Sequence, residues 1–280
     1  MYESELKYLL ELLDDENDRS AQLAMAELLK GDQSRLSQCL SSMQSSNNPR
    51  LHRRVHQLEN AIRARKKRTL PGQKLKQTAD NRFPLMEAAL QFHLAWFDND
   101  QVKTVRTQWD GLLTDLKIKK GPSPTLRDVA DFLKKTGFSA PLNDDLAADF
   151  YCLGMVIDEK YGSDVLLALI AVELLRQTGR NAAIIRYADD YGVSDLNGNW
   201  VFPAYEWEFN LQKDPPSADR DFEVVPDLNV IRFIGSMLFV CAVGSDSFRY
   251  VYTISETLSS LCGNHRITQS LPYPYTMGER

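Results

Sequence analysis

The chain is poor in cysteine and histidine, the residue types on which thiol catalysis and most zinc sites depend. Its 280 residues include four of each. Cys39, Cys152, Cys241 and Cys262 are far apart and form no CxxC pair. This spacing argues against a disulfide framework or a zinc knuckle, and it is typical of proteins from a reducing compartment.

The sequence also lacks the segments that would place it in or across a membrane. No run approaches the roughly 18 consecutive apolar residues that a membrane helix needs. Residues 1–5 carry neither the basic region nor the apolar region of a signal peptide. We therefore expect a cytoplasmic protein with no membrane partner.

Basic residues are outnumbered by acidic ones, 33 to 38, which gives a net charge of −5, yet they cluster in one segment. Residues 50–76 contain ten Lys or Arg side chains and one acidic residue, Glu59. Its densest part, the island at 63–68, could contact phosphate groups, an acidic partner or the chain's own acidic loops. Aromatic side chains for stacking bases are absent from it, which argues against single-strand recognition. The candidate basic patch consists of Arg63, Arg65, Lys66, Lys67 and Arg68.

The first 68 residues show paired helical stripes. Apolar residues recur at helical spacing from Leu6 to Leu13, and polar runs at 14–18 and 45–49 interrupt the pattern. The offset between the two units, from Arg19 to Arg50, is 31 residues, the scale of an α-solenoid repeat. We expect a HEAT-like helical arm that docks on later parts of the chain, because two units cannot bury both of their faces alone. An irregular helical subdomain is the equal alternative.

Beyond a Pro-Gly linker at 69–73, helical and strand patterns alternate. Thr125 and Gly137 have the positions of helix caps, and 144–161 is expected to be helical. Residues 182–187 predict a buried strand, and Asn197-Gly198 predicts a hairpin turn before a strand that begins at Trp200 and continues past Pro203. Residues 230–261 fit strands or helices, and we favour a helical pair that breaks near Gly244.

The most informative segment is the apolar run from Tyr161 to Leu175, which opens at Gly162 and ends before Gly179. It predicts a helix that the fold surrounds on every side. Cysteine-nucleophile enzymes of papain or transglutaminase architecture place their thiol at the start of such a helix. Here that start carries Ser163 and Asp164 instead.

The run from Leu153 to Gly162, the helix that ends at Gly179 and the strand after it together resemble the bacterial SirB-type transglutaminase-like proteins. Segments 12–16 and 50–65 look like the N-terminal helical repeat region of that family. The similarity in order spans most of residues 5–190 and is sharpest over 153–179. It implies a core in which a central helix packs on a small antiparallel sheet.

The polar positions of the family motif are changed. Phe150-Tyr151 stand where the family usually has Asn-Ser, Asp164 stands near its proline, and 188–190 (Ala-Asp-Asp) fall where it has Pro-Gly-His. No catalytic residue carries over. A thiol triad would also require a histidine between residues 94 and 264, and that interval has none.

Several rebuilt sites are weighed against structural roles. Cys152 with His265 forms a conceivable dyad, although a buried thiol is the ordinary interpretation. Ser163 has a helix cap as its default role. The aspartates at 189, 190 and 195 could act as acid and base or hold a cation, but Asp195-x-Asn197-x-Asn199 fails the calcium-loop pattern and fits a polar turn better. His52 and His56 have the spacing of a two-histidine metal site, but a solvated helix face explains them better.

We expect a predominantly helical α+β protein: a HEAT-like arm (1–68), a degenerate transglutaminase-like core (69–210), and an acidic loop with a helical C-terminal element (211–280). The expected function is non-catalytic binding of a protein, peptide or ligand, without cofactor or metal. The alternatives are a hydrolase or transferase that uses Ser163, Cys152 or the pair Asp189 and Asp190, and a nucleic-acid-associated protein that uses 50–76. The candidate groove is framed by Ser163, Asp164, Asp189 and Asp190.

Overall fold

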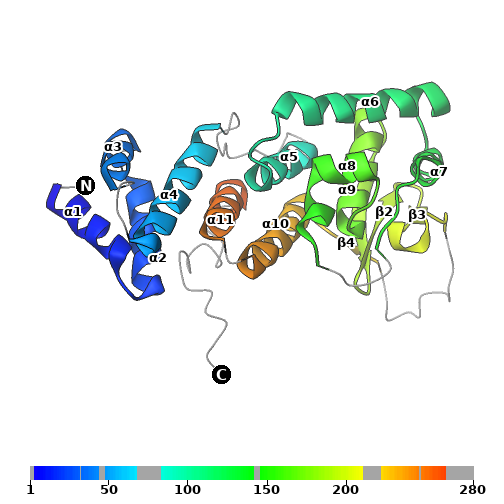
Figure 1. Cartoon of the computed structure of the whole chain (residues 1–280). Helices are drawn as coiled ribbons and strands as arrows, with labels where there is room; N and C mark the ends of the chain where they lie inside the picture. The colour runs from blue at the N-terminus through cyan, green and yellow to red at the C-terminus, as the bar shows by residue number, and fades with distance from the viewer. Residues whose placement is uncertain are drawn as a thin grey trace.

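The computed structural model describes residues 3–31, 33–43, 48–67, 83–141, 146–210, 222–245 and 247–262. In these residues helices predominate, and the strands form one small antiparallel sheet. The molecule is elongated, with the N-terminal helices at one end and the sheet at the other (Figure 1). The expected class, a predominantly helical α+β fold, is confirmed.

The N-terminal arm is built from five elements: α1 (Glu3–Glu11), η1 (Leu12–Asp14), α2 (Asp18–Lys30), α3 (Gln33–Met43) and α4 (Pro49–Lys67). They enclose a hydrophobic core that is separate from the main one. The side chain of Asn17 accepts a hydrogen bond from the Arg19 amide at 2.9 Å, and that of Asn48 accepts one from the Arg50 amide at 3.1 Å. The two interruptions of the helical pattern thus cap the following helices in the same way, at the predicted offset.

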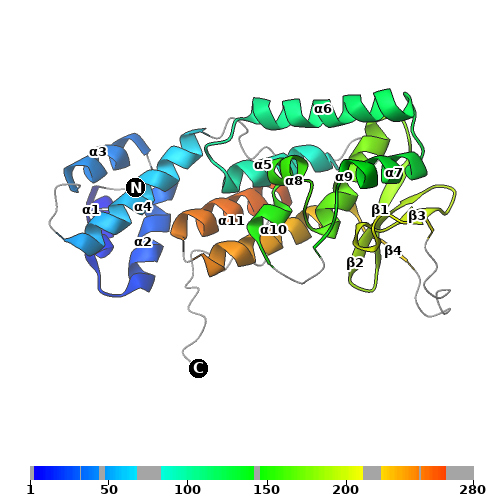
Figure 2. The same ribbon diagram turned by 45° about the vertical axis from the view of Figure 1, so that its right-hand side comes forward.

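The arm docks on α11 (Phe248–Cys262), which lies beside α4 in Figures 1 and 2. Phe248 belongs to the core of the arm, and Tyr252 packs against that core. The expectation that the arm docks on a later part of the chain is confirmed. Its support is the last helix of the described chain rather than the segment next to it in sequence.

The C-terminal element is a helical hairpin of α10 (Asp227–Gly244) and α11. The expected helical pair and its break at Gly244 are therefore confirmed. Among the described residues, α10 is long and apolar enough to cross a membrane by length and composition, so the sequence-based exclusion of such a segment was too strict. A Cβ on Gly235 would lie 2.5 Å from Phe92 of α5 (Leu85–Trp96) and 2.7 Å from Leu258 of α11. This face of α10 therefore packs closely between two helices, whereas about a third of the helix as a whole is buried.

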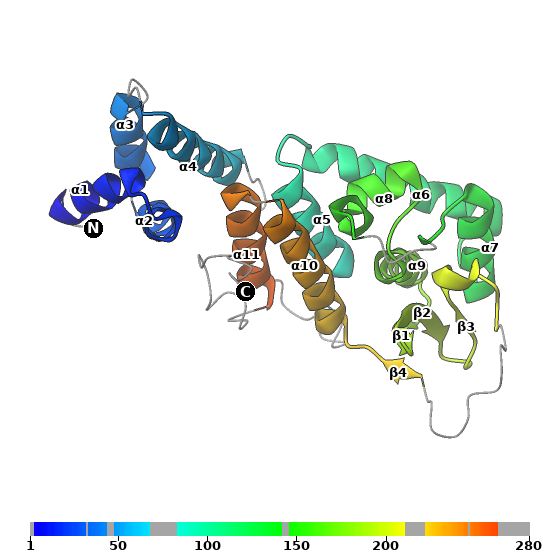
Figure 3. The ribbon, with the colours of Figure 1, turned by 60° about the horizontal axis from the view of Figure 1, so that its bottom comes forward.

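The central helix is α9 (Asp164–Gln177), and every residue from Val165 to Leu175 is buried. It is enclosed by α5, α7 (Leu126–Thr136), α8 (Leu153–Glu159), α10 and the sheet. Figure 3 views α9 nearly along its axis, with the strands on one side and helices around the rest. The α6 helix (Val102–Lys120) runs over α7 and α8. The prediction of a helix that is buried on every side is confirmed.

The sheet has the strand order β3-β2-β1-β4, from β1 (Ala182–Tyr187), β2 (Asp190–Asp195), β3 (Trp200–Val201) and β4 (Glu223–Val224). The predicted strand at 182–187 and the hairpin turn at Asn197-Gly198 are confirmed. The predicted continuation past Pro203 is wrong, since Pro203–Tyr205 forms a 3-10 turn, η3, and Trp207 has a φ of 61°. The Trp207 indole donates to the Phe138 carbonyl at 2.8 Å, and Phe209 then forms a single antiparallel bridge with Val201.

Residues 144–161 do not form the single helix that was expected. A 3-10 turn, η2 (Ala148–Tyr151), is followed by Cys152 in an extended conformation, and α8 then begins at Leu153. Residues 142–145 lie outside the described residues. Cys152 therefore lies at the joint between two helical elements, not within a helix. The α7 caps are as expected, with Thr125 and Asp128 forming a capping box and Gly137 in the left-handed region.

An ion pair joins the central helix to the C-terminal hairpin. The Arg176 guanidinium of α9 donates to both carboxylate oxygens of Asp227, at 2.8 and 3.0 Å, and to the Ala182 carbonyl at 3.3 Å. Asp227 also accepts from the Phe83 amide at 3.1 Å. Glu173 lies 3.6 Å from Arg176, and all three charged side chains are only 11–12% exposed. This network connects α9, β1, α10 and the chain segment before α5.

Candidate functional site

Ser163 is held in place by three hydrogen bonds at the start of α9. Its hydroxyl donates to the Phe150 carbonyl at 3.0 Å and accepts from the Leu166 amide at 3.4 Å. Its own amide also donates to Phe150 at 3.0 Å. The residue is buried, with 6% of its surface exposed. Ser163 thus satisfies a free amide of the first turn and ties α9 to η2, which is the expected cap.

Asp164 connects the first turn of α9 to strand β2. One carboxylate oxygen accepts from the Val165 amide at 2.7 Å, and the other accepts from the Tyr191 amide at 2.6 Å. Burial raises the pKa of this carboxyl to about 6, and the charge of Asp190 adds to the shift. A carboxyl that titrates near neutral pH suits an acid–base catalyst. Here, however, both oxygens are engaged by backbone amides.

Asp190 lies close to Asp164, whereas Asp189 does not join them. The Tyr205 hydroxyl donates to Asp190 at 2.5 Å, and this hydrogen bond raises the pKa of Tyr205 to about 12. Asp189 is exposed on the turn between β1 and β2. Of the four residues expected to frame a groove, the structure therefore brings together Ser163, Asp164 and Asp190.

Cys152 is fully buried. Burial, together with the nearby charge of Asp149, raises the pKa of its thiol well above the ordinary value. A thiol of this kind is the inert form of cysteine. His265, the proposed partner, lies outside the described residues.

A different histidine, His93, lies in the core, and no pattern in the sequence indicated that it would be buried there. The His93 ring is 1% exposed, and its Nε2 lies 3.0 Å from an oxygen of Asp100. Its Nδ1 has no partner among the described residues. Gly154 of α8 packs against the ring, since a Cβ at that position would lie 2.6 Å from His93 Cε1. Burial lowers the pKa of the imidazole, and Asp100 opposes the shift only in part. His93 precedes Cys152 in sequence, so the Cys-before-His order of a transglutaminase could not have indicated it.

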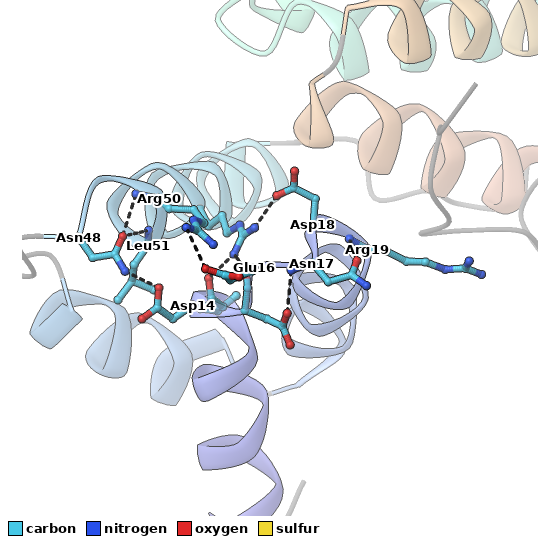
Figure 4. A network of polar contacts seen from close by, with 11 residues as sticks. Asp14, Glu16, Asn17, Asp18, Arg19, Asn48, Arg50 and Leu51 are labelled. Atoms are coloured by element: carbon cyan, nitrogen blue, oxygen red, sulfur yellow. Dashed lines mark hydrogen bonds and ion pairs between the residues drawn. The ribbon is translucent and has the colours of Figure 1, made fainter. Parts of the chain in front are cut away.

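The basic segment is used in part by the arm itself. Arg54 is 4% exposed and donates to the carbonyls of Leu13 at 2.8 Å and Asp15 at 2.6 Å, and also to the Asp18 carboxylate. Figure 4 shows the turn at 14–18 facing the start of α4, where Arg50 approaches Glu16 at 3.9 Å. Two arginines at the start of the basic segment thus contact an acidic turn of the chain itself.

The rest of the basic segment extends along α4. Arg63, His52 and His56 are exposed there. In the described ranges, no group of three or more His, Cys, Asp or Glu side chains is placed to hold a metal ion. The other members of the candidate basic patch cannot be placed in a site, because the side chains of Arg65, Lys66 and Lys67 are not described and Arg68 lies outside the described residues.

A cavity of about 520 Å³ lies near the C-terminal end of α9, away from the expected groove. Its walls come from the start of α7, from Gly179 and Arg180 after α9, from the β2–β3 turn and from Phe209. In that turn, Asp195 accepts hydrogen bonds from the amides of Asn197 at 2.8 Å and Asn199 at 3.0 Å. The predicted polar turn is confirmed.

In comparisons with protein-family models, curated proteins and solved structures, none matches this chain.

Proposed function

We propose that the chain is a non-catalytic, cytoplasmic binding protein with a degenerate transglutaminase-like core and a HEAT-like arm. One observation carries the proposal: Ser163, at the helix start where cysteine-nucleophile enzymes place their thiol, donates its hydroxyl to the Phe150 carbonyl and accepts from the Leu166 amide. A serine nucleophile instead needs a side-chain base within hydrogen-bond reach to take its proton, and here that proton is donated to a backbone carbonyl. The start of α9 therefore supports the fold.

The arrangement of helices suits binding. Stacked helical repeats present extended surfaces to partners, and this arm has an exposed row of basic and histidine side chains on α4. The α11 helix fixes the arm to the main body, so both parts present their surfaces in a defined orientation. A protein or peptide partner fits these surfaces better than a nucleic acid does, because Arg50 and Arg54 are already engaged within the arm.

The proposal predicts that neither candidate nucleophile is activated. Native protein at neutral pH is exposed separately to a fluorophosphonate and to iodoacetamide, and peptide mapping locates any adduct. We expect no adduct on Ser163, and alkylation of Cys152 on the order of a hundredfold slower than in the urea-unfolded chain, because burial and a raised pKa suppress the thiolate. Cys39, which is half-buried on the arm, serves as an internal comparison.

Stoichiometric labelling of Ser163, or native alkylation of Cys152 faster than in the unfolded chain, would show a rebuilt active site. In that case the hydrolase or transferase alternative would replace the binding function.

A further inference from the structure

The cavity near the end of α9 has two cationic side chains in its wall, Arg127 and Arg180. Neither forms an ion pair with a carboxylate in the part of the chain that the structure describes. The Arg127 guanidinium lies 4.4 Å from the centre of the Phe209 ring, and Arg180 donates to the Ser123 carbonyl at 3.1 Å. Both guanidinium groups are thus supported by neutral groups and keep further N–H donors for a ligand.

The acidic side chain in the wall does not neutralise these arginines. Asp195 accepts from two backbone amides and, at 2.9 Å, from the Asn199 side chain. These bonds hold its carboxylate within the β2–β3 turn. Two guanidinium groups facing one such carboxylate leave a net positive cavity.

Apolar side chains complete the wall. Leu126 and Leu175 are buried beside the cavity, and Phe209 is half-buried. Leu196, at the tip of the β2–β3 turn, is 80% exposed, the most exposed of the large hydrophobic side chains described. A ligand with an apolar body would cover this leucine and Phe209 together. The cavity volume also falls within the usual range for small-molecule sites, roughly 300–1,000 Å³.

We propose that this cavity binds a carboxylate attached to an apolar or aromatic body. Arg127 and Arg180 bind the carboxylate, because a guanidinium matches its planar geometry with paired hydrogen bonds. Leu196 and Phe209 contact the body. The carboxylate can come from a free small molecule or from the C-terminus of a peptide, since the chemistry is the same. The inference deepens the proposed function by naming the class of ligand, and rests on it only for the premise that the chain binds.

The test is calorimetric titration of the full chain, supported by NMR line shifts for weak ligands. The probes are N-acetylphenylalanine and its amide for the small-molecule source. A pentapeptide that ends in Phe, as the free acid and as the C-terminal amide, serves for the peptide source. We expect at least one free acid to bind, with an affinity at least about tenfold higher than that of its amide. This difference corresponds to the free energy of about one hydrogen bond to a charged group. Whichever pair shows this difference identifies the source.

Three variants separate charge from apolar contact. Arg127→Gln and Arg180→Gln should each weaken binding of the acid by about tenfold or more and change binding of the amide little. Leu196→Ser should weaken the binding of the acid and the binding of the amide by the same factor. Arg106→Gln, on the surface of α6, is the matched control and should change neither. All four side chains are exposed or near the surface, so the variants are expected to fold.

The inference fails if neither free acid binds at a ligand concentration of about 10 mM. This concentration is roughly ten times the dissociation constant of about 1 mM that is typical of weak binding. It also fails if acid and amide bind equally, or if the arginine variants bind the acid as the parent does. These outcomes are independent of covalent labelling at Ser163 or Cys152, which tests the proposed function alone.

Discussion

Replacing Arg176 by methionine is expected to lower the free energy of unfolding by about 3–5 kcal/mol, the usual cost of removing one partner from a buried ion pair. The substitution leaves Asp227 and Glu173 as uncompensated buried charges, each 12% exposed. It also removes a donor from the Ala182 carbonyl. Because the network joins α9 to β1 and α10, the loss should appear in the global transition, measured by urea denaturation.

The matched control for this variant is Arg106→Met. Arg106 also binds a carboxylate with paired hydrogen bonds, to Glu87 at 2.8 and 3.0 Å, but it is 44% exposed. Exposed ion pairs contribute about 0–1 kcal/mol, so this variant should unfold almost as the parent does. If Arg176→Met and Arg106→Met were equally stable, the buried network would not hold the hairpin to the central helix.

Replacing Arg54 by methionine is expected to destabilise the arm by about 2–4 kcal/mol, the cost of leaving buried carbonyls without donors and breaking a partly buried pair. The Leu13 and Asp15 carbonyls at the η1 turn lose their partner. The arm has its own hydrophobic core, so the effect should be local. Hydrogen exchange should accelerate in α1 and α2 while the amides of α9 stay protected.

Arg53→Met serves as the control for the arm, because Arg53 is an exposed neighbour on the same helix. Surface substitutions of this kind change stability by about 0.5 kcal/mol or less. Faster exchange in α9 of the Arg54 variant, to the same degree as in α2, would show that the arm and the main body unfold as one unit.

The elements that could be predicted from the sequence are those whose signals are local. The low polarity of Val165–Leu175 identified the buried helix, and Thr125 with Gly137 marked the ends of α7. The two polar interruptions, in which the structure shows caps at Asn17 and Asn48, also lie within short segments. Such features depend only on residues that are close in sequence, so a single sequence is enough to predict them.

The features that could not be predicted depend on contacts between distant segments. Nothing near Arg176 indicates that Asp227 completes its ion pair, and nothing near Asp164 indicates the Tyr191 amide. The strand expected past Pro203 is replaced by a turn whose Trp207 indole contacts the Phe138 carbonyl, 69 residues away in sequence. The cavity is likewise lined by segments that are far apart in the sequence, the first at Thr125 and the last at Phe209.

The same division applies to the candidate site. The cap role of Ser163 follows from its position before an apolar helix and is confirmed. The closeness of Asp164 and Asp190 requires the β1–β2 hairpin to fold back on α9, where Asp164 accepts a hydrogen bond from the Tyr191 amide of β2.

In the proposed function, the start of α9 supports the fold instead of carrying out chemistry. The most direct test is the free energy of unfolding of Ser163→Ala beside Ser163→Thr, because removal of a structural cap costs stability whereas loss of a catalytic side chain is often neutral or stabilising. We predict that Ser163→Ala loses about 1–2 kcal/mol and that Ser163→Thr, which keeps the hydroxyl, loses less than half as much. A Ser163→Ala variant as stable as the parent, or more stable, would contradict the claim.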